Sequence, residues 1–392
     1  MHESDSAKDG EISLADVGQF AIDCIVGTRP NFVKIAPILR ALRARPQFSV
    51  RLIHTGQHYD FEMDQAIFEE LGISPPDLRL KLEPAPGPET VARMLSALAA
   101  AFAAKRPDLV VVVGDVHSTL AAALAASLST IKLAHVEAGL RSFDRDMPEE
   151  LNRLVVDRLA DLLFVTEASG VENLRAEGSA TQVIELVGNV MIDTLFASRD
   201  RAPPAGEILA EILAECGADP GIAGNFGIVT LHRPSNVDAA DKLAGLLDGL
   251  ARISRDLPLV FAVHPRTSAN IARFGLAGRL AGARVTMTKP LSYLRLVGLM
   301  RSARVVITDS GGLQEESVAL GTPCVTVRDN TERPATLDSG NILSGSDPAE
   351  MERAVREVLA GRVVCGPLPA LWDGHAAERI ADAIISHFGL AN

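Results

Sequence analysis

The feature that most constrains the fold of this 392-residue chain is an apolar pattern that occurs twice. In each half, short runs rich in Val and Ile alternate with segments of helical periodicity, and a polar loop follows each run. The first half opens at residue 20 with FAIDCIVGTRPNFVKIAP, and the second opens at residue 226 with FGIVTLHRPSNVDAADKL. Such alternation is typical of parallel βαβ units. The sequence therefore predicts an α/β protein with two doubly wound, Rossmann-like domains.

Later segments of the two halves correspond in the same order. The stretch DLVVVVGDVHSTLAAALAA at 108–126 corresponds to ARVVITDSGGLQEESVAL at 303–320. The polar, Pro-rich stretch at 198–206 separates the halves and predicts a domain boundary. We expect a polar N-terminal tail over 1–19, a first domain over 20–197, a second over 198–370 and a C-terminal helix over 371–392.

Composition excludes several classes of protein. A net charge of −12 argues against a nucleic-acid-binding protein, because phosphate backbones attract basic surfaces. No run approaches the roughly 18 apolar residues of a membrane span, and the start lacks the apolar region of a signal peptide, so we expect a cytoplasmic protein without membrane contact. The cysteines are widely spaced, which favours reduced thiols over disulfides or a metal site. They are Cys24, Cys216, Cys324 and Cys365.

Charged and imidazole side chains follow nearly every predicted strand. Ligands of parallel α/β sheets bind beyond the carboxyl ends of the strands, so these loops should line a cleft between the two domains. The residues concerned are Arg29, Lys34, His54, His58, Asp115, Glu137, His232, Arg233, His264, Arg266 and those of 310–316.

The stretch VVITDSGGLQEES ends a predicted strand with two glycines and two glutamates. Ser310 is a candidate N-cap, and Gly311 and Gly312 would begin a helix whose free amide groups suit a phosphate. We expect Glu315 and Glu316 in the first turn, where the helix dipole favours carboxylates and where either could bind a sugar hydroxyl. A capped helix without any ligand remains the alternative.

Two cations in the first half are candidates for binding phosphate. GTRPNFVK places Arg29 and Lys34 five residues apart, across a loop and the first turn of a helix. Both can then face one cleft, where phosphate or pyrophosphate would be their natural target. Solvated surface cations are the alternative.

Three acids follow consecutive predicted elements, namely Asp115, Glu137 and Glu149. Carboxylates in a cleft that also binds phosphate repel the ligand unless they transfer protons or bind hydroxyls. We therefore interpret them as candidate catalytic groups. For Glu149, as for Glu150, a plain role as a first-turn helix acid stays open.

The chain also carries a set of ordered motifs, within a similarity that runs from about Ala21 to beyond Asn341: GTRPNFVKIAP, TGQH, VVVGDVHST, HVEAGLRS, PEELNR, GNVMIDTL, TLHRPSN, TDSGGLQEES and RDNTERP. In these motifs it resembles the bacterial non-hydrolysing UDP-N-acetylglucosamine 2-epimerases. The resemblance implies a GT-B fold, with two domains facing across a cleft and the nucleotide bound by the second. It also implies a homodimer without metal or cofactor, and a last helix around 375–387 that packs back on the first domain.

The family interconverts UDP-N-acetylglucosamine and UDP-N-acetylmannosamine for envelope polysaccharide synthesis, through loss of UDP to a 2-acetamidoglucal and its re-addition. The resemblance implies proton transfer by Asp115, Glu137 and Glu149, with the face served by each left open, and a catalytic role for His232. It implies that the UDP phosphates are held by Arg29, Lys34, His232, Ser310, Gly311, Gly312 and Arg333, and the ribose by Glu316.

The chain departs from better-known members at two motifs. Pro234 and Ser235 stand where those members have Arg-Glu, which bears on a second, activating UDP-sugar site that would involve Gln57, His58 and Arg233. Asn31 replaces the usual acid, which leaves the exact sugar open. The alternatives are an epimerase of a related UDP-sugar such as a diacetamido uronic acid, a hydrolysing 2-epimerase, a GT-B glycosyltransferase and a non-catalytic nucleotide-sugar sensor.

Overall fold

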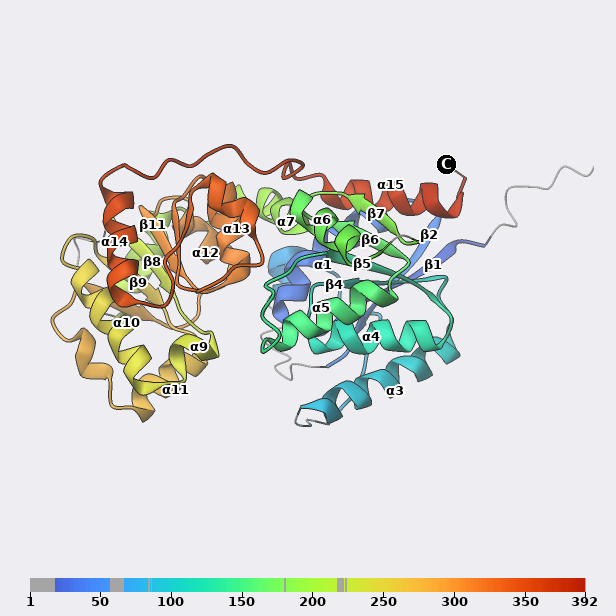
Figure 1. The fold of residues 1–392 in the computed structure, drawn as a ribbon, viewed down its shortest axis with the longest axis horizontal. Helices are drawn as coiled ribbons and strands as arrows, with labels where there is room; N and C mark the ends of the chain where they lie inside the picture. The colour runs from blue at the N-terminus through green and yellow to red at the C-terminus, as the bar shows by residue number, and fades with distance from the viewer. Residues whose placement is uncertain are drawn as a thin grey trace, which may run out of the picture.

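The computed structural model describes residues 18–56, 67–83, 85, 87–179, 181–216, 222 and 224–391. Most of the predicted N-terminal tail, residues 1–17, lies outside this description. Figure 1 shows two α/β lobes side by side, each built around a twisted sheet. We call the lobe that holds β1 to β7 the first lobe and the lobe that holds β8 to β13 the second lobe.

In the described part of the first lobe, seven parallel strands follow the spatial order β3-β2-β1-β4-β5-β6-β7. The strands are β1 (Phe20–Val26), β2 (Phe48–His54), β3 (Leu78–Arg79), β4 (Leu109–Val113), β5 (Lys132–Ala138), β6 (Leu162–Val165) and β7 (Val183–Leu186). The helices are α1 (Arg29–Arg43), α3 (Pro88–Ala104), α4 (His117–Leu128), α5 (Pro148–Leu159), α6 (Ala168–Ala176) and α7 (Val190–Arg199).

The second lobe repeats this winding with six parallel strands among its described residues, in the order β10-β9-β8-β11-β12-β13. Its strands are β8 (Gly227–Thr230), β9 (Leu259–Ala262), β10 (Val285–Thr288), β11 (Val305–Thr308), β12 (Cys324–Thr326) and β13 (Asn341–Leu343). Its helices are α8 (Ala205–Cys216), α9 (Pro234–Val237), α10 (Ala240–Ile253), α11 (Pro265–Arg273), η2 (Ala277–Leu280), α12 (Tyr293–Met300), α13 (Gly311–Ala319), η3 (Pro334–Ser339) and α14 (Pro348–Leu359).

The strand order of both sheets reverses at the first strand of each lobe, between β1 and β4 and between β8 and β11. This is the doubly wound arrangement, which opens a crevice beyond the carboxyl ends of the strands at the reversal. The predicted fold class of two Rossmann-like α/β domains is confirmed.

The central strands read as continuous apolar runs because helices cover both faces of each sheet. All five residues of β4, Leu109–Val113, are fully buried. Val111 packs in the cluster that contains α1, whereas Val110 and Val112 pack in the cluster that contains α3 and α4. Burial on both faces is typical of parallel sheets. The edge at which β4 ends is therefore rigidly placed.

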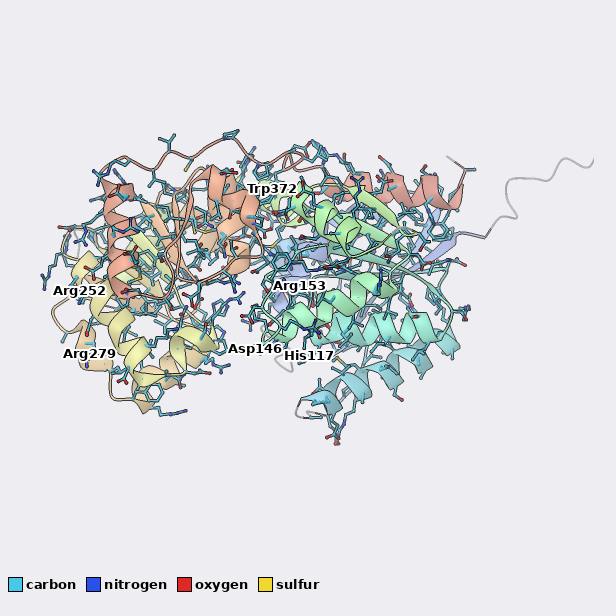
Figure 2. The ribbon with its side chains drawn as sticks, in the orientation of Figure 1. His117, Asp146, Arg153, Arg252, Arg279 and Trp372 are labelled. Atoms are coloured by element: carbon cyan, nitrogen blue, oxygen red, sulfur yellow. The ribbon has the colours of Figure 1, made fainter. Side chains whose placement is uncertain are left out.

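A long connection carries the chain back from the second lobe to the first. It leaves α14, passes Trp372 between the lobes, and enters α15 (Ala376–Phe388), which lies along the first lobe (Figures 1 and 2). The buried Trp372 donates its indole N–H to the backbone oxygen of Thr166 at 3.1 Å. Ile380 and Ile384 of α15 pack in the same apolar cluster as Phe32 of α1.

The predicted boundary at 198 falls inside the last turn of α7, which ends at Arg199. This helix contacts α1 of the first lobe as well as α12 and α13 of the second. Its last turn is held across the lobe boundary, since Arg301 donates to the backbone oxygen of Arg199 at 2.5 Å. The polar composition of the stretch therefore did not mark the end of the helix. In the described part of the chain, every helix is too short or too polar to cross a membrane.

Asp193 of α7 supplies a test of how the returning helix is held. Its carboxylate accepts hydrogen bonds from the amides of Ala376 and Ala377, at 3.1 and 2.7 Å, and so caps the start of α15. Asp193→Ala should lower the free energy of unfolding by about 1–2 kcal/mol, because both amides lose their acceptor. It should also speed hydrogen exchange across α15.

The matched control is Asp347→Ala, which removes the exposed cap of α14, where the side chain accepts from the amide of Ala349. That variant should leave exchange in α15 unchanged. Unaltered exchange of α15 in the Asp193 variant would contradict the proposed role of this cap.

Candidate active site

A cavity of about 610 Å³ lies where the strand-end loops of the two lobes meet. Loops after β1 and β4 line it from the first lobe, and loops after β8, β11 and β12 line it from the second. Figure 2 shows Arg153 and Asp146 on the side of the first lobe that faces the second. The predicted site residues in its lining are Arg29, Lys34, Asp115, Glu149, His232, Arg233, Ser310, Gly311, Gly312, Glu316 and Arg333.

Not every strand-end residue reaches the cavity. His54 is fully buried and packs against Phe32 and Phe68 in the core of the first lobe. Arg266 pairs with Asp238 on the surface. His264 caps α11 by accepting from the amide of Arg266, and its ring lies 5.5 Å from that of His232. The expectation that His54 and Arg266 line the cleft is therefore wrong. The ring of His54 packs in the apolar core, and the guanidinium of Arg266 forms an ion pair at the surface. Gln57 and His58 lie outside the described residues.

Glu137 lies directly behind the lining rather than in it. Its carboxylate pairs with Lys34 of α1 and, at 3.5 Å, with Arg333 of the second lobe, and both cations line the cavity. The backbone of Glu137 has φ 71°, a left-handed conformation that is rare for a residue with a side chain. The register between β5 and β6 shifts at this point, between Val136 and Ala138. This bulge breaks the alternation of the strand and directs Glu137 toward the second lobe.

Asp115 is fixed from three sides at the end of β4. Gly114 turns the chain with φ +68°, a conformation that residues with a side chain rarely adopt, and a Cβ there would lie 2.9 Å from Lys34 Nζ and displace it. Asn152 of α5 donates to the backbone oxygen of Asp115 at 2.7 Å, and Arg153 pairs with its carboxylate at 2.9 Å. The carboxylate is therefore held at the cavity wall in one orientation.

Glu149 and its neighbour Glu150 differ in environment. Glu149 is exposed in the cavity lining, whereas Glu150 is buried. The Glu150 carboxylate accepts from the amides of Ser142 and Phe143 and pairs with Arg153 at 2.9 Å. Glu150 thus anchors the loop before α5, and only Glu149 can meet a ligand.

The double glycine begins α13, as predicted, with Ser310 at the N-cap position. The Ser310 side chain makes no capping hydrogen bond. A side chain at either glycine would displace the end of a neighbouring side chain, since a Cβ on Gly311 would lie 2.9 Å from Glu332 Oε1 and one on Gly312 would lie 2.9 Å from Met191 Cε. The start of this helix is therefore pressed close to both α7 and the loop after β12.

The expectation that the two glutamates occupy the first turn of α13 is wrong, since that turn contains no acid. Both lie in the second turn and are buried. Glu315 pairs with Arg333 at 2.9 Å and accepts from Asn189, the N-cap of α7, at 2.8 Å. Arg333 and Asn189, rather than the helix dipole, therefore stabilise the Glu315 carboxylate.

Glu316 lines the cavity beside Tyr293 of α12. Burial raises the pKa of Glu316 from its ordinary 4.5 to about 8, against the opposing effect of the Tyr293 hydroxyl. Burial and the neighbouring carboxyl raise the pKa of Tyr293 well above its ordinary 10. The buried Glu316 Oε1 has no hydrogen-bond partner among the described residues. This carboxyl is thus suited to a hydroxyl of a ligand.

His232 is oriented by Asp309, a residue that the sequence reasoning did not single out. Asp309 accepts from the amides of His232 and Arg233 and lies 2.9 Å from His232 Nδ1. Burial alone would raise the pKa of Asp309, but the hydrogen bonds of His232, Arg233 and Asn236 hold it below its usual range. With Nδ1 engaged, Nε2 is the ring nitrogen left for a ligand. A buried acid directly after a strand was the signal that could have found Asp309.

Asn31, noted above as a departure from the usual acid, ties two strand ends together. Its Oδ1 accepts from the amides of Gly27 and Thr28 after β1, and its Nδ2 donates to the backbone oxygen of Val113 at 3.0 Å. A carboxylate at this position could not donate to Val113. The substitution is therefore compatible with the site but changes how the loop is held.

The described cavity lining carries cationic and acidic side chains in equal number although the chain has a net charge of −12. Arg29 forms no ion pair with another described residue, which leaves its guanidinium free for an anion. A polyanion and hydroxyl groups can both be bound in such a mixed lining. Among the described residues the lining cations are Arg29, Lys34, Arg153, Arg233 and Arg333, and the lining acids are Glu70, Asp115, Glu149, Glu316 and Glu332. No group of three His, Cys, Asp or Glu among those residues is arranged to hold a metal ion.

Comparison with known proteins places this site in a family context. The family model described as UDP-N-acetylglucosamine 2-epimerase matches residues 40–385. A UDP-N-acetylglucosamine 2-epimerase of Methanococcus maripaludis is 38% identical over 344 residues, which covers 87% of this chain and 92% of the relative. A UDP-2,3-diacetamido-2,3-dideoxy-D-glucuronate 2-epimerase of Pseudomonas aeruginosa is 35% identical over 363 residues, covering 91% and 97%.

The fold of this chain is also similar to that of a solved UDP-GlcNAc 2-epimerase structure. The crystal structure of the Methanocaldococcus jannaschii UDP-GlcNAc 2-epimerase, in complex with UDP-GlcNAc and UDP, superposes with a TM-score of 0.84. The two sequences are 35% identical, and the match covers 93% of this chain and 99% of that one. The similarity therefore includes both lobes.

The raised pKa of Glu316 predicts a pH-dependent stability. The folded protein binds this proton more tightly than the unfolded chain, so stability falls as pH rises from about 4.5 to about 8. Glu316→Gln has no proton to lose and lacks this slope. The free energy of unfolding of Glu316→Gln minus that of the wild type should therefore rise by on the order of 2–4 kcal/mol between pH 5 and pH 8.5.

Urea unfolding at several pH values measures this difference. Glu207→Gln, at an exposed position on α8, is the control and should track the wild type at every pH. A constant gap between wild type and Glu316→Gln across this range would rule out the buried, protonated carboxyl.

Proposed function

This chain belongs to the UDP-N-acetylglucosamine 2-epimerase family, and on that premise we propose that it interconverts UDP-N-acetylglucosamine and UDP-N-acetylmannosamine. The observation that carries the proposal is the joint lining of one cavity by acids and by cations. Asp115 and Glu149 stand in the wall, Glu137 lies behind it, and the cations come from both lobes. A cavity that only bound a nucleotide would gain nothing from three acids beside a diphosphate.

The diphosphate of the substrate would lie between the lobes. Arg29 and Lys34 would hold it from the first lobe, and Arg333, His232 and the amides at the start of α13 from the second. Charge-assisted hydrogen bonds of this kind are strong and become more so where water is excluded. The lone, buried Glu316 Oε1 would accept from a ribose hydroxyl.

Epimerisation requires removal of the hydrogen at sugar C2, which no neighbouring carbonyl acidifies. Breaking the C1–O bond to UDP gives C1 oxocarbenium character, and the C2 proton then passes to a carboxylate. The products of this step are a 2-acetamidoglucal and UDP. Protonation of C2 on the opposite face and return of UDP to C1 complete the inversion, so no atom is gained or lost. Carboxylates on both faces are needed, and the cations stabilise the charge on the leaving diphosphate.

Glu137 links the two parts of this mechanism. Its carboxylate shares Lys34 and Arg333 with the site proposed for the diphosphate. Diphosphate oxygens that bind these two cations would compete with Glu137 for them. We propose that this competition frees the Glu137 carboxylate for proton transfer once the substrate has bound.

A related UDP-sugar is the second candidate substrate. The Pseudomonas aeruginosa relative, named for a diacetamido glucuronate, is 35% identical over 91% of this chain. The same elimination and re-addition would apply, because the reaction involves only C1 and C2. Asn31, which replaces the usual acid at the cavity wall, is a position at which the two substrates could be distinguished.

Other parts of the proposal rest on the family resemblance. We propose a homodimer that works in the cytoplasm without a metal or dissociable cofactor. The exposed apolar side chains of Leu151 and Val155, one turn apart on α5, and of the nearby Phe143 are consistent with a second copy packing there. Light scattering that gives the 41.6 kDa mass of one chain in solution would contradict the dimer.

The experiment that tests the function is incubation with UDP-N-acetylglucosamine in heavy water, without a sugar acceptor, followed by NMR. Deuterium at C2 of a sugar that still carries UDP is the expected result. Free N-acetylmannosamine with UDP would indicate a hydrolysing enzyme. A parallel incubation uses the UDP-linked diacetamido uronic acid. Deuterium in that sugar alone would make it the substrate of the proposed reaction. No deuterium in either sugar would favour a glycosyltransferase or a sensor.

The adjacent acids of α5 provide a matched pair of variants. Glu149→Gln should lower kcat by about two to four orders of magnitude, with UDP affinity and unfolding little changed, because this carboxyl meets only the cavity. Glu150→Gln should chiefly destabilise the fold, because Ser142, Phe143 and Arg153 depend on its charge. Calorimetric UDP binding, turnover and thermal unfolding separate the two effects. Normal turnover of Glu149→Gln would remove Glu149 from the mechanism.

A further inference from the structure

His135 is a fully buried polar side chain at the rear of the cavity, on β5 two residues before Glu137. The exposed fraction of its side chain is 1%. Its Nδ1 lies 2.6 Å from Asp157 Oδ1 of α5, and its Nε2 lies 2.9 Å from the backbone oxygen of Gly114. Gly114 is the residue directly before Asp115, so the ring holds the peptide that carries Asp115.

The partners of His135 determine which groups donate. A backbone carbonyl oxygen can only accept, so Nε2 donates to Gly114. Burial would raise the pKa of Asp157, but His135 and Arg141 outweigh it and hold the pKa below its usual range. The Asp157 carboxylate is therefore ionised, and it lies within hydrogen-bond distance of His135 Nδ1. The imidazole thus bridges the loop that carries Asp115 and a buried carboxylate through its two ring nitrogens.

The second oxygen of Asp157 extends the bridge to the loop of Glu137. It accepts from the amide of Gly139 at 3.1 Å and pairs with Arg141 at 2.7 Å. Gly139 has φ +79°, and a Cβ there would lie 2.3 Å from the backbone oxygen of Gly170. The turn that follows Glu137 is thus held by the same carboxylate that holds His135.

We infer that His135 and Asp157 act together as positioning residues that keep the Asp115 and Glu137 loops in fixed register with one another. The inference rests on the proposed function, because it concerns the two acids assigned to proton transfer. Neither His135 nor Asp157 lines the cavity. Their effect on the reaction is transmitted through the backbone at Gly114 and Gly139.

A purely stabilising role does not explain the pair. Buried ion pairs contribute little net stability compared with apolar residues of the same volume. The backbone nearby is strained, since Glu137 adopts a left-handed conformation between two bonds of this network. Such conformations persist only where surrounding contacts over-determine them, and they occur preferentially at functional sites. The His135–Asp157 pair provides those contacts for both loops.

Two substitutions of His135 separate its two hydrogen bonds. The amide of Gln reaches about as far as Nε2, so His135→Gln can still donate to Gly114. The amide of Asn reaches only as far as Nδ1, so His135→Asn can contact Asp157 but not Gly114. We expect His135→Asn and Asp157→Asn to lower kcat by about 10–100-fold, with KM and the UDP dissociation constant within about threefold. His135→Gln should recover part of this loss.

The control for general destabilisation is Asp23→Asn. Asp23 is also buried in the first lobe and pairs with Arg51, but it lies within β1, away from the cavity. This variant should lower the melting temperature and leave kcat unchanged. A parallel loss of kcat in Asp23→Asn would mean that any buried charge deletion impairs the enzyme, and the positioning role would fail.

A double-mutant cycle with Asp115→Asn tests whether His135 acts through Asp115. If it does, adding His135→Asn to Asp115→Asn should lower kcat far less than it does in the wild type, because the group to be positioned is already disabled. Effects that multiply in full would show that His135 acts independently of Asp115 and would overturn the inference.

Hydrogen exchange followed by mass spectrometry provides a readout that does not depend on turnover. His135→Asn should speed exchange in the segment 112–116, Asp157→Asn should speed it in both 112–116 and 137–141, and neither should change α15; Asp23→Asn should alter neither segment. Wild-type protein that is inactive on both UDP-sugars would refute the proposed function. The exchange rates would still show whether the His135–Asp157 pair holds both loops. Unchanged exchange in both segments would refute the anchor itself.

Discussion

The arrangement of the site depends on one cluster of buried charges between the lobes. The carboxylate of Glu137, from the first lobe, meets Lys34 of its own lobe and Arg333 of the other. Arg333 in turn pairs with Glu315 at 2.9 Å and with Glu332 at 3.4 Å. Removing one member would leave an uncompensated charge in the interior, at a cost of several kcal/mol. The cluster therefore fixes how the two strand-end edges face one another, and the cavity follows from it.

The sequence predicted the fold and the location of the site because both follow from simple periodic patterns. Apolar runs alternating with helices specify parallel sheets, and parallel sheets bring the ends of their strands to one edge. Arg29, Asp115 and His232 were found by this reasoning, and the structure places all three in one cavity. The repetition of the pattern in the second half indicated the second lobe.

The sequence could not predict features that depend on tertiary contact. Nothing in HVEAG marks the bulge that turns Glu137 out of its strand, since no glycine stands at the left-handed position. The burial of Glu315 depends on Asn189 and Arg333, which are distant in the chain. Arg266 was expected in the cleft by analogy with the other strand ends, but Asp238 offers it a partner at the surface. His135 and Asp157 were missed because neither follows a strand, although both touch loops that do.

The return of the chain to the first lobe has a consequence for how the protein is made. The apolar cluster around Phe32 includes Ile380 and Ile384, which come after every described strand of both lobes in the chain. A nascent chain that has produced β1 to β7 still lacks one wall of the first lobe's core until α15 has been synthesised. Because domains generally fold as units during translation, the second lobe can complete its packing before the first. Of the two lobes, the one that is synthesised first is then the one that matures last.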